Sequence, residues 1–202
     1  MTCEFSHPLR PIDWALIGKA VSFYVGKGFS YVEAPWAVSK KAIDYTLPEG
    51  ALDIALSTEW NAVLVGSAEQ SLLELRLEDS LPEGDLVAVS PCFRGEAYTS
   101  YAEVRQMTFM KVELFSTGTE DYLRLVSLAE EFFEHELHLP VERLHTEMGV
   151  DLFYANLEVG SYGTRTIALP DGKPFTWSYG TGLAEPRSSA ANLMKTKILR
   201  QP

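Results

Sequence analysis

The chain has 202 residues, of which 46% are hydrophobic and 22% are charged, a composition that suits one globular domain and excludes a disordered chain. Its 28 acidic residues outnumber its 17 Lys and Arg, and the net charge is −11, so we expect little attraction for RNA. The sequence lacks a membrane-length apolar run, a signal-peptide pattern and a cysteine motif for metal or disulfides. We therefore expect a single cytoplasmic domain over 1–202, with no membrane association.

The amino-terminal part predicts helices interrupted by short strands. Residues 11–25 carry apolar side chains at helical spacing, and two glycines end that helix. The segment GFSYVEAPWAV, residues 28–38, predicts a strand closed by its proline. Within 51–75 we expect a helix or broken helix, followed by a short strand over 62–65 and a further helix over 66–77.

A central hairpin places charged and aromatic side chains on one face. Its first limb contains the apolar run 86–89, residues 97–102 predict the loop, and the second limb covers 105–115. Because strand side chains alternate between faces, one face presents Arg94, Glu96, Arg105, Phe109 and Glu113. Guanidinium groups bind phosphate or carboxylate oxygens, and an aromatic ring offers a flat surface for a base. The hairpin predicts a nucleoside-triphosphate platform; the alternative is a solvated face with ordinary cross-strand ion pairs.

The carboxyl-terminal half predicts a long helix, two strands and a final helix. Residues 119–137 form an amphipathic pattern, with Gly118 or Thr119 as the cap. Residues 151–167 and 175–179 predict strands joined by the turn PDGKP, and residues 187–199 predict the last helix. The fold class expected from these elements is α+β, an antiparallel β-sheet flanked by helices.

Three separated segments, in this order, resemble the signature motifs of class II aminoacyl-tRNA synthetases. GFSYVEAP, residues 28–35, is similar to the first motif, a strand that ends in a proline at the dimer interface. FRGE, residues 93–96, followed by Arg105, Phe109 and Glu113 at four-residue steps, resembles the second. YGTGLAEPR, residues 179–187, resembles the third, a glycine-rich strand that enters a helix carrying an arginine. The resemblance implies the fold of that catalytic core.

Within this class the chain most resembles seryl-tRNA synthetases. CFRGEA and FMKVELF are similar to that family's second motif nearly residue by residue, and Ser67-Ala68-Glu69 resembles its Thr-Ala-Glu segment. Glu185 and Pro186 replace small residues of the third motif. The family's amino-terminal tRNA-binding arm has no counterpart in this sequence. Between the second and third motifs the family has a strand followed by a serine-rich metal and substrate segment, and here one short piece, LEVGSYGTR (157–165), covers both.

The resemblance implies a nucleotide-binding role for each hairpin residue. Arg94 would contact the α-phosphate and the substrate carboxylate, and Glu96 would accept a hydrogen bond from the adenine amino group. Phe109 would stack on adenine, with Arg187 on the other side. Arg105 and Arg187 would hold the outer phosphates of ATP. Arg94 and Arg187 are thus the expected catalytic residues.

Three glutamates complete the site that the resemblance implies. Mg²⁺ would bridge the phosphates to Glu158. Glu69 would bind the ammonium group of the amino acid, and Glu113 would contact the side chain of a small amino acid. For Glu69 the alternative is a solvated carboxylate at a helix start.

These expectations favour a tRNA-independent, ATP-dependent ligase. It would form an aminoacyl-adenylate and pass the aminoacyl group to a carrier protein or a small-molecule amine, with no stable binding of tRNA. The first alternative is a non-catalytic synthetase homologue acting as a regulator or partner subunit. The second is tRNA charging with an arm supplied by another protein.

The first motif also predicts a homodimer. Phe29, Tyr31 and Val32 give its strand more apolar surface than an edge strand leaves exposed. In the class II synthetases, this strand and the preceding helix meet their symmetry mates.

Overall fold

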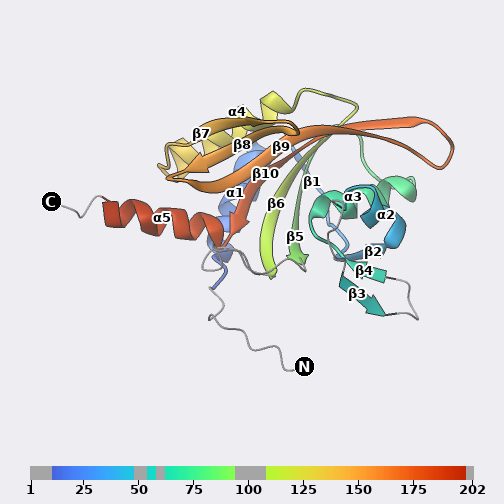
Figure 1. The fold of residues 1–202 in the computed structure, drawn as a ribbon, viewed down its shortest axis with the longest axis horizontal. Helices are drawn as coiled ribbons and strands as arrows, with labels where there is room; N and C mark the ends of the chain where they lie inside the picture. Colours follow the sequence, from blue (N-terminus) through green and yellow to red (C-terminus); the bar gives the residue numbers. More distant parts are fainter. Residues whose placement is uncertain (1–10, 48–53, 58–61, 94–107, 199–202) are drawn as a thin grey trace.

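The computed structural model describes residues 11–47, 54–57, 62–93 and 108–198 (Figure 1). Its main sheet has seven strands in the order β1-β5-β6-β10-β9-β8-β7. In that order they are Ser30–Tyr31, Asp85–Phe93, Thr108–Thr117, Pro174–Glu185, Leu157–Ala168, Gly149–Tyr154 and Glu142–Thr146. Every neighbouring pair is antiparallel except β1 and β5, which are parallel. The sheet is thus mixed at one edge, and the expected α+β class is confirmed.

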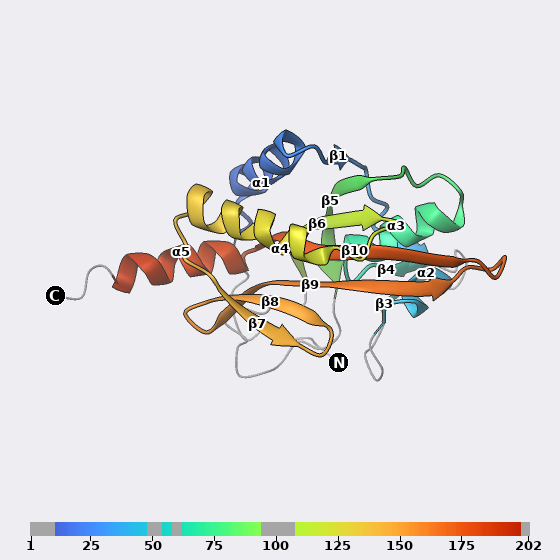
Figure 2. The same cartoon turned by 90° about the horizontal axis from the view of Figure 1, so that it is seen from above.

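A small second sheet and six helical segments surround the main sheet. The small sheet has the order β2-β4-β3, formed by Ala37–Ser39, Ala62–Leu64 and Ile54–Ser57. The helices are α1 Trp14–Gly26, α2 Lys40–Asp44, α3 Ala68–Leu77, α4 Tyr122–Glu131, the π-helix η1 Phe132–Glu136 and α5 Arg187–Ile198. In Figure 2, α1 and α4 lie on one side of the main sheet, and α5 extends away from the end of β10.

The two faces of the main sheet bury two separate cores. On β6, Val112 and Leu114 pack with α1 and α4 on one face, and Phe115 packs with α3 on the other. Because alternate residues of β6 enter different cores, both of its faces are buried, one under α1 and α4 and the other under α3. The charged residues of β6 therefore lie inside the protein.

Helix α1 is fixed at both ends to the strand that carries the third motif. Asp13 caps the helix by accepting a hydrogen bond from the Leu16 amide at 2.9 Å. Near the other end, the buried Tyr24 hydroxyl donates to the Gly182 carbonyl oxygen at 3.0 Å. A Cβ at Gly182 would lie 2.7 Å from the Tyr24 ring, so a glycine is needed for this close approach.

Several local predictions differ from the structure in the amino-terminal half. The strand expected over 28–38 is split, since only Ser30–Tyr31 joins the main sheet and Ala37–Ser39 belongs to the small one. Phe29 is 3% exposed and lies in the core, so its expected exposure is wrong, whereas Tyr31 is 48% exposed. Ile54–Ser57 forms a strand, not a helix, and the short helix α2 had no predicted counterpart.

The second half is also more finely divided than the sequence pattern indicates. Helix α4 begins at Tyr122 and is capped by Asp121, whose carboxylate accepts from the Arg124 amide, so neither expected cap residue is used. The strand expected over 151–167 is a hairpin with a turn at Ala155 and Asn156, both at positive φ. Strand β7 was missed because all five of its residues are exposed and leave no alternating pattern.

Candidate active site

One face of the main sheet, beside α3, carries the predicted functional residues. Register places Cys92 opposite Phe109 and Ser90 opposite Lys111, so these side chains share a face with Glu113. On the neighbouring strand Thr181 lies opposite Glu113. The predicted shared face of Phe109 and Glu113 is therefore confirmed. Arg94, Glu96, Arg105 and the expected loop over 97–102 lie outside the described residues.

Glu113 is a buried carboxylate that is neutralised by its neighbour on the same strand. It is fully buried, and Lys111 is 9% exposed. The Lys111 ammonium nitrogen lies 2.9 Å from each of the two carboxylate oxygens. A charge can be kept in such a place when it is paired and hydrogen-bonded. The face is therefore not the solvated surface of the alternative interpretation. Strand alternation already places Lys111 on the same face as Phe109 and Glu113, but no role in the site was predicted for it.

Glu69 is buried too, at the start of α3. It is 6% exposed, so the solvated helix-start alternative is wrong. Its Oε1 accepts from the Trp177 indole N–H at 2.8 Å, and its Oε2 accepts from the Arg165 guanidinium at 2.6 Å. The guanidinium lies over the ring of Tyr179, 4.5 Å from its centre. Both oxygens of Glu69 thus have charged or polar partners, none of which was predicted.

The charges of this cluster act on one another. Burial by itself lowers the pKa of Arg165, but the charge of Glu69, the nearby Tyr179 hydroxyl, the hydrogen bond to Glu69 and the charge of Glu113 together raise that pKa above its ordinary value. Burial raises the pKa of Tyr179, and the positive charge of Arg165 opposes that rise. Arg165 therefore stays a cation, and it lies within electrostatic range of both glutamates that were expected to bind the amino acid.

Arg187 at the start of α5 and Glu158 on β9 form a third ion pair. Arg187 is the first residue of α5, directly after β10, as the third motif predicts. Its guanidinium donates to the Glu158 carboxylate at 3.0 Å and to the Glu158 carbonyl oxygen at 3.1 Å. The arginine expected to bind phosphate and the glutamate expected to bind metal are thus brought together.

A further carboxylate, Asp151, lies close to Glu158. Burial raises the pKa of Asp151, a hydrogen bond with Ser161 opposes the rise, and the charge of Glu158 adds to it. Among the described residues no three side chains form a metal-binding group. Two carboxylates still suit Mg²⁺, which in nucleotide sites is bound by one or two carboxylates together with substrate phosphates. Glu158, with Asp151 beside it, therefore fits the expected ion.

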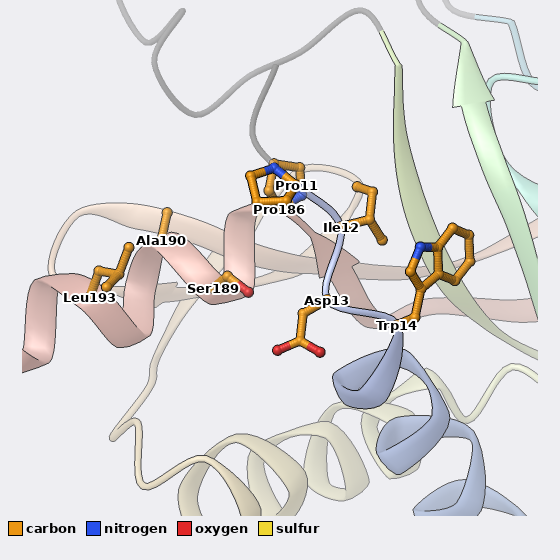
Figure 3. Close-up of a pocket in the computed structure, with 8 residues that line it drawn as sticks. All are labelled: Pro11, Ile12, Asp13, Trp14, Pro186, Ser189, Ala190 and Leu193. Atoms are coloured by element: carbon orange, nitrogen blue, oxygen red, sulfur yellow. The ribbon is translucent and has the colours of Figure 1, made fainter. Parts of the chain in front are cut away.

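Glu185, which departs from the family pattern, joins α1 to α5. Its carboxylate accepts from the Ser189 amide at 2.9 Å, from the Ser189 hydroxyl at 2.6 Å and from the Asp13 amide at 3.4 Å. Beside it lies a pocket of about 450 Å³ at the start of both helices (Figure 3). The pocket is lined by Pro11, Ile12, Asp13, Trp14, Pro186, Ser189, Ala190 and Leu193. Glu185, which replaces a small residue of the third motif, thus links the starts of α1 and α5, and it is not among the predicted site residues.

The Glu185→Gln variant is expected to be more stable than the wild type at neutral and alkaline pH. Burial raises the pKa of the Glu185 carboxyl, an effect that the hydrogen bonds from Ser189 partly oppose. A raised folded-state pKa means that Glu185 contributes most to stability when protonated and that this contribution is lost as pH rises through the folded pKa. The stability gained by Glu185→Gln over the wild type should therefore be absent at pH values below the ordinary carboxyl pKa and should increase as the pH rises above it. Thermal unfolding across pH measures it, with the exposed Glu83→Gln as control; a gain independent of pH would contradict the explanation.

Comparison with known proteins identifies the fold and the relatives of this chain. No protein-family model matches the chain. It is 30% identical over 152 residues to the serine–tRNA ligase of Desulfotalea psychrophila, a match that covers 67% of this chain and 36% of the relative. It is 24% identical over 220 aligned positions to the serine–tRNA ligase of Desulfurococcus amylolyticus, a match that covers 94% of this chain and 43% of the relative. Seryl-tRNA synthetase from Pyrococcus horikoshii, solved complexed with ATP, superimposes with a TM-score of 0.72 at 22% identity, covering 89% of this chain and 49% of that one.

The fold is that of the class II aminoacyl-tRNA synthetase catalytic core. Within that class, the chain is a homologue of seryl-tRNA synthetases. The matched region spans less than half the length of each of these relatives. In the part of the chain that the structure describes, no helix is both long enough and apolar enough to cross a bilayer.

Proposed function

We propose that the chain is an ATP-dependent, amino-acid-activating ligase that works without tRNA. It forms an aminoacyl-adenylate and passes the aminoacyl group to a carrier protein or a small-molecule amine. The observation that carries the proposal is the shared face of Phe109 and Glu113 on β6, together with the pairing of Arg187 of α5 with Glu158 of β9. The relationship to seryl-tRNA synthetases supports the same chemistry.

The reaction needs no nucleophile from the protein. A carboxylate oxygen of the amino acid attacks the α-phosphorus of ATP, and the bond to the pyrophosphate oxygen breaks. The site's contribution is alignment and charge neutralisation. Arg94 aligns the two reactants, Glu96 and Phe109 hold the adenine, and Arg105 and Arg187 bind the outer phosphates.

Mg²⁺ is part of this proposal. Glu158, together with Asp151, would hold the ion, and when bound it neutralises phosphate charge. In this arrangement Arg187 lies beside the metal ligand because it already pairs with Glu158. The arginine is therefore held near the place where the outer phosphates would lie.

ATP–pyrophosphate exchange across the twenty amino acids tests the proposed activity directly. Exchange with at least one amino acid, in the absence of tRNA, supports the proposal.

A mobility-shift assay with total tRNA at near-physiological salt tests whether tRNA is the acceptor. No complex is expected, because a net charge of −11 opposes the approach of a polyanion. A specific complex at micromolar protein would favour tRNA charging.

The second candidate is a non-catalytic homologue that acts as a regulator or partner subunit. It is favoured by the pairing of both expected amino-acid-binding glutamates, Glu69 with Arg165 and Glu113 with Lys111. Calorimetry separates the two candidates: binding of ATP without exchange for any amino acid would support the non-catalytic role.

We also propose that the protein is a homodimer that pairs through α1 and β1. β1 is an edge strand of the main sheet, and Tyr31, together with Trp14 and Val25 of α1, is 45–62% exposed. Light scattering at micromolar concentration should give twice the 22.5 kDa of one chain. Tyr31→Glu should shift the mass toward the monomer, because a charge would be buried in the interface. A monomeric wild type would rule the dimer out.

A further inference from the structure

The two glutamates expected to bind the amino acid are each already paired with a cation of the protein. Glu69, expected to bind an ammonium group, already accepts a hydrogen bond from Arg165 at 2.6 Å. Glu113, expected to bind the substrate side chain, is neutralised by Lys111 at 2.9 Å. The four charges sum to zero before any substrate enters.

An amino acid that binds Glu69 through its ammonium group must displace Arg165. Both oxygens of Glu69 are engaged, and the side chain is 7% exposed, so little of it is open to a second cation. Displacement alone would leave a guanidinium without its carboxylate in a site that is largely closed to water. Separating a buried pair is unfavourable unless the released charge finds a new partner.

A substrate with a second carboxylate supplies that partner. Its ammonium group replaces Arg165 on Glu69, and its side-chain carboxylate pairs with the released guanidinium. One ion pair is exchanged for two, and with the α-carboxylate bound by Arg94, as in the proposed function, every charge of the substrate is compensated. A neutral side chain such as a methyl or hydroxyl group has no charge for Arg165.

Arg165 is better suited to this role than Lys111. The Lys111 side chain is 11% exposed and its ammonium group is held by both oxygens of Glu113. The Arg165 side chain is 25% exposed. Its guanidinium has five N–H donors in a planar fork that matches a carboxylate, and its described hydrogen bond, to Glu69, uses one of them. Stacking on the Tyr179 ring keeps the Arg165 guanidinium in place while its partner changes from Glu69 to the substrate carboxylate.

We propose that Arg165 is a specificity-determining residue and that the site selects an amino acid with a carboxylate in its side chain. The inference rests on the proposed function, because it names the substrate class of the same site. It narrows the small amino acid expected from the sequence to an acidic one. It also explains why Glu69 and Arg165, 96 residues apart, form an ion pair in the substrate pocket.

The test compares aspartate with asparagine, which have the same shape and differ in the side-chain charge. Calorimetry in the presence of a non-hydrolysable ATP analogue measures binding, and pyrophosphate exchange measures turnover. The wild type should prefer aspartate by about ten- to a hundredfold, the worth of a charged hydrogen-bonded contact. Glutamate and glutamine, tested in the same way, define the chain length that the pocket accepts.

Two variants separate the roles of the pair. Arg165→Gln, which keeps a hydrogen-bond donor for Glu69, should remove the preference, because aspartate loses the partner of its side-chain carboxylate and asparagine no longer has to separate an ion pair. Arg165→Lys keeps the charge and should retain part of the preference. Glu69→Gln should weaken aspartate and asparagine by similar factors, because both carry the ammonium group. Arg143→Gln is the matched control, because Arg143 of β7 pairs with Glu130 of α4, away from this face. This variant should change neither affinity.

The outcomes distinguish this inference from the proposed function. Equal binding of aspartate and asparagine, or an unchanged preference in Arg165→Gln, overturns the inference even where exchange with another amino acid supports the ligase. A preference for aspartate in binding without any exchange supports the inference and overturns the ligase. Binding of no amino acid by the wild type or the variants overturns both.

Discussion

The Arg187→Ala variant is expected to lose ATP–pyrophosphate exchange by about 10²–10³-fold, the effect of removing one group that stabilises charge developing in a transition state. Arg187 is held at the end of β10 by two hydrogen bonds to Glu158. A phosphate-binding guanidinium that is already oriented costs little reorganisation during the reaction. Single-turnover measurement of adenylate formation would show whether the loss lies in the chemical step.

The control for this variant is Arg143→Ala. Arg143 also pairs with a glutamate, Glu130, but through the exposed strand β7. It should leave exchange unchanged, and both variants should keep the wild-type circular dichroism spectrum. Full exchange activity in Arg187→Ala would remove Arg187 from the proposed reaction.

The Trp177→Ala variant is expected to lower the free energy of unfolding by about 3–5 kcal/mol, the range measured for truncating a large buried aromatic side chain. Trp177 is fully buried and stacks with Phe115 and Phe175, at centroid distances of 5.8 Å and 5.5 Å. Its indole N–H also donates to Glu69, so the truncation leaves a buried carboxylate with one fewer partner. Urea denaturation measures the loss.

Two further variants divide this effect into its parts. Trp177→Phe keeps an aromatic ring and removes the N–H, so it reports mainly on the hydrogen bond to Glu69. Trp36→Ala is the matched control, because Trp36 is 53% exposed, and it should change stability by less than about 0.5 kcal/mol. Equal effects of Trp36→Ala and Trp177→Ala would contradict the buried stack.

Local sequence patterns were sufficient to predict the elements that frame the site. The hairpin of β5 and β6, the start of α3 at Glu69 and the passage from β10 into α5 at Arg187 each follow from contiguous residues. Alternation and turn residues encode such elements directly. For the same reason the shared face of Phe109 and Glu113 could be predicted.

The partners of the predicted residues could not be found in this way. Arg165 and Trp177 reach Glu69 from 96 and 108 residues away in the sequence. Nothing local marks them, since Arg165 lies in a strand of mixed polarity and Trp177 in an apolar one. Their role depends on strands that become neighbours only when the sheet is complete.

The position of β10 in the sheet governs when the protein can fold during its synthesis. β10 lies between β6 and β9, and among the described strands it is the last to leave the ribosome. Until residues 174–185 emerge, the remaining strands of the main sheet form two separate halves, β1-β5-β6 and β9-β8-β7, each with an open edge. Trp177 and Arg187 are also missing at that stage. We therefore expect the nascent chain to complete its site only after residues 174–187 have emerged, and to depend on protection from aggregation until then.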